Sequence, residues 1–76
     1  MKIQVMGPGC AKCAQAEKIV KQALEESGIE AEVVKITDFQ EIASLGVFST
    51  PAVAVNGEVK IVGKVPSKAE VLDWLK

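Results

Sequence analysis

The chain has 76 residues, of which 49% are hydrophobic, and a formal net charge of −1 at pH 7. This composition predicts one small folded domain spanning residues 1–76 and excludes a disordered chain, which would carry less apolar content and more net charge. All nine basic residues are lysine and ten residues are acidic, so we expect no nucleic-acid partner. No apolar run approaches the roughly 20 residues that span a bilayer, and residues 1–6 lack a long apolar stretch, so we expect no signal peptide. We therefore expect a cytoplasmic protein without a membrane partner.

The first two predicted elements are a strand and a long helix. Lys2–Met6 is rich in β-branched residues, which favours a strand, and Gly7-Pro8-Gly9 ends it. Apolar residues then recur at helical spacing over Ala11–Ser27. Gly28 is the residue type expected just after a helix end.

A second strand and a short helix follow. Glu32–Ile36 is rich in Val and Ile, which predicts a strand. Asp38 and Glu41 have the spacing of a capping box, so a short helix should begin there. Its apolar residues, which we expect to form its buried side, are Phe39, Ile42 and Leu45.

A hairpin and a final helix complete the pattern. Ala52–Val55 and Glu58–Val62 read as strands joined by Asn56–Gly57, a strong hairpin signal. Ser67 and Glu70 form a second potential capping box, which opens the last helix. The two large apolar residues outside these patterns, which we expect to be buried or half-buried, are Phe48 and Trp74.

The predicted order is β-α-β-α-β-β-α. A helical connection makes the first two strands parallel, and a two-residue turn makes the last two antiparallel. We therefore expect an α/β fold in which a four-stranded mixed sheet is flanked by three helices.

The two cysteines, Cys10 and Cys13, lie where the first strand passes into the first helix. Unpaired N–H groups and a partial positive charge at a helix N-terminus favour a thiolate, and Lys12 adds a cation that could tune the same group. The spacing predicts that Cys10 is the exposed nucleophile. Cys13, one helical turn further on, would resolve the mixed disulfide and leave a Cys10–Cys13 bridge.

Other readings of this pair are weaker. Buried structural cysteines fit poorly with the Gly-Pro-Gly lead-in, and zinc usually takes four Cys or His ligands, whereas this chain has two cysteines and no histidine. A soft-metal carrier that binds Cu(I) through both thiolates stays open, and Met6 slightly favours it. However, small Cu(I) carriers of this kind have a ferredoxin-like fold with the element order β-α-β-β-α-β, which differs from the order predicted for this chain. An adaptor that binds partners without redox chemistry is a third reading. We expect no metal and no cofactor besides the redox-active disulfide.

The chain as a whole resembles the thioredoxin fold in its minimal, glutaredoxin-like form, and especially the small redox-active disulfide proteins of archaea and bacteria. The shared motifs are Gly9-Cys10-Ala11-Lys12-Cys13, Thr50-Pro51 and Asn56-Gly57-Glu58. This resemblance implies a monomeric thiol–disulfide oxidoreductase. It also implies that Pro51 is cis beside the sulfurs and that the Thr50 backbone pairs with an extended partner segment. The implied partners are a thioredoxin-reductase-like dithiol reductase and an oxidised client protein.

The chain departs from known relatives of this fold in its cysteine motif and in the stretch before its last helix. The residues between the cysteines are Ala11 and Lys12, not the Gly-Pro of thioredoxin or the Pro-Tyr of many glutaredoxins. The stretch 62–67 has one glycine and no aspartate, whereas glutaredoxins carry a Gly-Gly pair and an Asp that hold glutathione. The second departure argues against glutathione as a partner.

Overall fold

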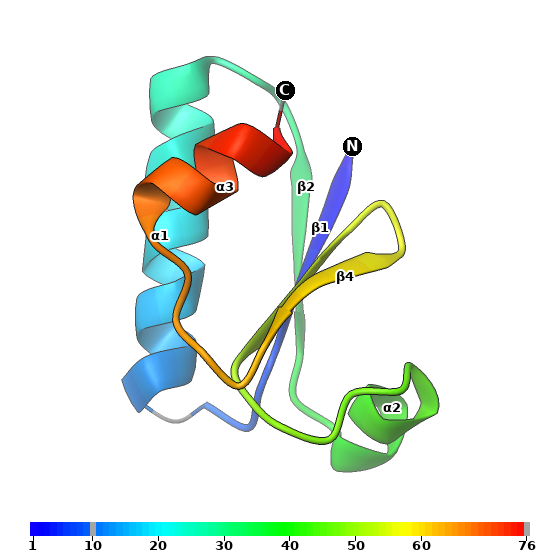
Figure 1. Cartoon of the computed structure of the whole chain (residues 1–76). Helices are drawn as coiled ribbons and strands as arrows, with labels where there is room; N and C mark the ends of the chain where they lie inside the picture. The colour runs from blue at the N-terminus through cyan, green and yellow to red at the C-terminus, as the bar shows by residue number, and fades with distance from the viewer. Residues whose placement is uncertain (10, 76) are drawn as a thin grey trace.

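The computed structural model describes residues 1–9 and 11–75 and has the predicted order of elements (Figure 1). The elements are β1 (Lys2–Met6), α1 (Ala11–Ser27), β2 (Glu32–Ile36), α2 (Phe39–Ser44), β3 (Ala52–Val55), β4 (Glu58–Val62) and α3 (Lys68–Trp74). The four strands and the long helix have the bounds that the sequence predicted. The fold class, a four-stranded mixed sheet flanked by three helices, is confirmed.

The strands form one sheet in the order β2-β1-β3-β4. β1 pairs in parallel with β2 and antiparallel with β3, and β3 pairs antiparallel with β4. At the carboxyl end of β1, Met6 is opposite Ile36 on one side and Ala52 on the other. The end of β1 is therefore next to the beginning of β3 in the middle of the sheet.

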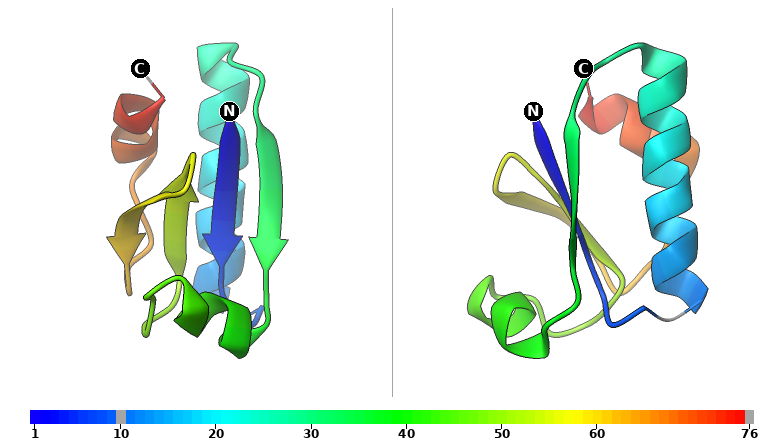
Figure 2. Two further views of the ribbon diagram at one scale, coloured as in Figure 1. Left: turned by 90° about the vertical axis from the view of Figure 1, so that its right-hand side faces the viewer. Right: turned by 180° about the vertical axis from the view of Figure 1, so that it is seen from behind.

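Helices α1 and α3 lie together on one side of the sheet, which we call the helical face, whereas α2 crosses one end of the other side, the α2 face (Figure 2). The buried core of the helical face combines residues of β1, β3, α1 and α3 with the C-cap of α3, Leu75: Ile3, Val5, Ala16, Val20, Ala23, Val53, Val55, Val71 and Leu75. Trp74 packs against this core and is half-buried, as predicted. An ion pair of 2.6 Å between Lys68 Nζ and Glu26 Oε2 joins α3 to α1.

The α2 face has a smaller core made of Met6, Ile36, Ile42, Val47, Ala52 and Ala54. Only Ile42 of α2 is buried, at 1% exposure. The prediction that Phe39 and Leu45 also form the buried side of this helix is wrong, because they are 64% and 44% exposed. A helix of 6 residues lying across the end of the sheet presents only about one turn to it.

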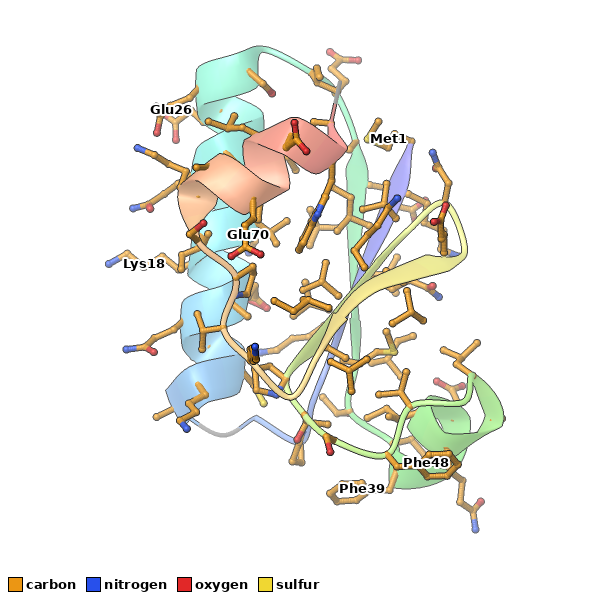
Figure 3. The ribbon with its side chains drawn as sticks, in the orientation of Figure 1. Met1, Lys18, Glu26, Phe39, Phe48 and Glu70 are labelled. Atoms are coloured by element: carbon orange, nitrogen blue, oxygen red, sulfur yellow. The ribbon has the colours of Figure 1, made fainter. Side chains whose placement is uncertain are left out.

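Phe48, in the loop after α2, is 84% exposed, so the expectation that it is buried or half-buried is also wrong. Phe39 and Phe48 both lie at the α2 end of the molecule (Figure 3). The views in Figures 1 and 2 place the beginning of α1 at this same end. Two exposed aromatic rings therefore share one end of the molecule with the first turn of α1.

The local signals in the sequence are mostly confirmed. Asn56 and Gly57 have φ of 52° and 84°, as a tight hairpin requires. Ser67 and Glu70 form the complete capping box, with bonds of 3.2 Å and 3.1 Å. Asp38 is the N-cap of α2, as predicted. Its side chain accepts a hydrogen bond from the Gln40 N–H, and not from the Glu41 N–H as the predicted capping box requires.

Candidate active site

The first turn of α1 holds the second cysteine of the motif. The helix begins at Ala11, and Cys13 is 1% exposed, with its side chain on the side of α1 that packs onto the protein. Lys12 precedes it and is exposed to solvent. Cys10, the predicted nucleophile, lies outside the described residues.

In the sheet, the segment that precedes α1 lies next to the segment around Pro51. Gly7 follows directly after Met6, and Pro51 directly precedes Ala52, so the Met6–Ala52 register makes both segments neighbours. The Gly7 N–H also donates to the Ile36 carbonyl, at 2.8 Å, which continues the β1–β2 ladder by one bond. The candidate site thus lies where three strands meet.

Cys13 lies directly against the backbone of Gly7. A Cβ added to Gly7 would be 2.2 Å from Cys13 Sγ and 3.7 Å from Thr50 Cβ. The sulfur therefore fills the place that a side chain at residue 7 would take, and Thr50 borders the same spot. From the sequence, Gly7 is expected only to end β1, because its approach to Cys13 depends on tertiary structure.

The Thr50–Pro51 peptide bond is cis. Pro51 is less than 2% exposed, whereas Thr50 is partly exposed. The Gly63 N–H donates to the Pro51 carbonyl at 2.9 Å, which ties this segment to the end of β4. The structure thus brings together Cys13, Thr50 and Pro51, three of the residues that the sequence singled out.

The described residues around the sulfur supply no buried charge. None of the polar or charged side chains in residues 1–9 and 11–75 is buried. In the same part of the chain, no three His, Cys, Asp or Glu side chains cluster as they would around a metal ion. Met6, which slightly favoured the Cu(I) reading, is fully buried in the core of the α2 face.

The element order, the C-x-x-C motif at the start of α1 and the proline at the start of β3 together define a protein of the thioredoxin fold. A family model described as a thioredoxin domain matches residues 1–76, and the chain belongs to this family.

The chain is also similar to individual archaeal proteins. A thioredoxin of Methanothermobacter thermautotrophicus is 46% identical over 71 residues, covering 93% of this chain and 92% of the relative. A thioredoxin of Methanocaldococcus jannaschii is 49% identical over 74 residues, covering 97% and 85%. A probable thioredoxin of Methanothermobacter marburgensis is 34% identical over 77 residues, covering 96% and 89%. None of the helices in the described part of the chain is long and apolar enough to cross a membrane.

Proposed function

We propose that this thioredoxin-type redox protein exchanges protein disulfides through Cys10 and Cys13. The observation that carries the proposal is the place of Cys13, buried in the first turn of α1 against the backbone of Gly7, with Thr50 bordering the same spot. The similarity to archaeal proteins named thioredoxin supports the same activity. In this proposal both thiols are catalytic residues.

The division of roles between the thiols follows from access. At 1% exposure, Cys13 cannot reach the disulfide of another protein. Cys10, the chain's other cysteine, is then the attacking group. The unpaired N–H groups at the beginning of α1 favour its thiolate, and Lys12 adds a positive charge nearby in the chain.

The reaction has two exchange steps. Cys10 Sγ attacks one sulfur of the client disulfide, forming a mixed disulfide, and the client's other sulfur leaves as a thiolate that takes up a proton. Cys13, after losing its proton, attacks Cys10 Sγ; the Cys10–Cys13 bond forms and the bond to the client breaks. The client gains two electrons and two protons, and the protein keeps an internal disulfide. Since no charged side chain is buried in the described residues, water is the acceptor we propose for the Cys13 proton.

We further propose that the partly exposed Thr50, beside the buried Pro51, holds the client by main-chain hydrogen bonds to an extended segment. Client peptides N-methylated next to their cysteine test this. Because each lost bond is worth about 1 kcal/mol, methylation of the paired N–H should raise KM roughly threefold to tenfold. Methylation of the next N–H, which points to the other side of an extended chain, is the control. Equal effects at both positions would rule out strand-like pairing.

The partner that restores the dithiol is, in this proposal, a protein reductase of the thioredoxin-reductase type in the cytoplasm. Residues 62–67 have one glycine and no aspartate, so they lack the groups with which glutaredoxins hold glutathione. The oxidised protein should therefore be reduced faster by such a reductase than by glutathione at equal reducing power. Faster reduction by glutathione would overturn this partner assignment.

The decisive experiment compares single cysteine variants, since the chain has two cysteines. Cys10→Ser should lose client reduction and form no mixed disulfide. Cys13→Ser should accumulate a long-lived mixed disulfide, which allows the captured client to be identified. The variant without both thiols is the control, and full function of that variant would favour the adaptor reading. Tight, stoichiometric Cu(I) binding without dithiol–disulfide cycling would replace this proposal with a metal carrier.

A further inference from the structure

We propose that Gly7 is a positioning residue for the second exchange step, because its missing side chain lets Cys13 Sγ take the position from which it attacks Cys10. This inference rests on the proposed function and adds a positioning residue to its two catalytic thiols. Gly7 itself does not touch the client or lose a proton.

The backbone of Gly7 does not by itself require glycine. The described glycines with positive φ are Gly9, Gly28, Gly46, Gly57 and Gly63. Gly7 is not among them, so its backbone conformation is open to alanine. Glycine is needed at residue 7 for the space that Cys13 occupies.

That space is tightly bounded. An alanine Cβ at residue 7 would be 2.2 Å from Cys13 Sγ and 3.0 Å from Cys13 Cβ, whereas ordinary contact begins at 3.4 Å. The backbone of residue 7 has little freedom to retreat, because its N–H is bonded to the Ile36 carbonyl at 2.8 Å and the preceding Met6 is fully buried. The sulfur must therefore move by about 1.2 Å.

Such a displacement acts on one step of the cycle. In the first step Cys10 attacks the client, and Cys13 takes no part. In the second step the S–S bond between Cys13 and Cys10 forms while the bond to the client breaks, and the client sulfur leaves with the electron pair. Because a misplacement of about 1 Å can cost about a hundredfold in rate, Gly7→Ala should slow this step by roughly tenfold to a hundredfold.

A single-turnover assay separates the two steps. The reduced protein is mixed with an aromatic disulfide whose thiolate product is coloured: attack by Cys10 releases the first equivalent and ring closure by Cys13 releases the second. For Gly7→Ala we expect an unchanged first phase and a second phase slowed by about tenfold or more. An unchanged second phase would overturn the inference. If the wild-type chain itself released a single equivalent, the proposed function would fail instead.

Two controls separate positioning from general destabilisation. Gly28→Ala lies at the far end of α1, has φ of 70° and would meet no atom within 4 Å, so it should strain the fold without slowing ring closure. A slow second phase in Gly28→Ala as well would count against a specific role for Gly7.

The second control removes the sulfur and keeps the test valid if Gly7→Ala folds poorly. Adding Gly7→Ala to Cys13→Ala should lower the denaturant midpoint less than adding it to the wild-type chain, because the closest clash is gone. An equal loss in both backgrounds would show that the sulfur is not what glycine accommodates, and would overturn the inference.

Discussion

Replacing Ile42 by alanine tests whether α2 is held on the sheet by a single side chain. Ile42 is 1% exposed and packs with Met6 and Ala52 in the core of the α2 face. The neighbouring Phe39 belongs to the same helix but is 64% exposed. The structure therefore predicts very different costs for two apolar residues that lie one turn apart.

The magnitude follows from what each substitution removes. Ile42→Ala removes three buried carbons at about 0.8 kcal/mol each and leaves a cavity, so the free energy of unfolding should fall by roughly 3 kcal/mol. For a chain of this size that corresponds to a Tm lower by about 12–24 °C. Phe39→Ala, whose ring is mostly in water already, should cost less than about 1 kcal/mol.

Denaturant unfolding in the presence of a reductant measures both variants. Trp74 is the chain's one tryptophan and packs on the helical face, away from α2, so its fluorescence reports global unfolding. Similar losses of stability in Ile42→Ala and Phe39→Ala would refute the assignment of Ile42 as the anchor. A larger loss in Phe39→Ala would mean that α2 packs through its other side.

Three further predictions concern a cap, a turn and the charge beside the thiols. Ser67→Ala should lower the free energy of unfolding by about 1 kcal/mol in denaturant titrations, and no loss would mean that this cap is not needed in solution. Asn56→Ala should cost about 1–2 kcal/mol because residue 56 has φ of 52°, and Asn56→Gly should recover most of it; equal losses would point to the hydrogen bond from the Lys2 N–H instead. Lys12→Gln should slow alkylation of Cys10 by less than about fivefold, with a smaller effect at high salt, because Lys12 is exposed; an effect independent of salt would contradict electrostatic tuning.

The elements were predictable because their ends carry strong local signals. Asn56–Gly57 fixes the hairpin through two positive φ angles, Gly28 ends α1, and Ser67 with Glu70 begins α3. These effects act within a few residues of the chain. They are therefore visible in the sequence without knowledge of the tertiary fold.

The errors concern which side chains are buried at the α2 end. The spacing of Phe39 and Ile42 suggests one apolar face, but α2 is too short for both to reach the sheet. Met6, Ile36, Ile42 and Val47 form that core together with two alanines of β3, and Phe48, next to Val47, lies in solvent. Burial there depends on the angle between helix and sheet, which local periodicity does not encode.

The candidate site was predictable in part. Chain order and the C-x-x-C motif singled out the first turn of α1, and the structure places Cys13, Thr50 and Pro51 together. The close approach of Cys13 to Gly7 was not predictable, because residues 7 and 13 meet only in the tertiary structure, where β1 has paired with its neighbours.

The turn at Asn56–Gly57 and the loop at Gly28 lie away from the end of the molecule that holds the first turn of α1 (Figure 1). A surface-immobilisation tag placed near either position would lie away from the first turn of α1. The pairing of β1 with β3, four consecutive residues of each strand in register, runs between these two ends of the molecule. A tether at that end of the molecule would therefore leave the opposite end, with the first turn of α1, accessible.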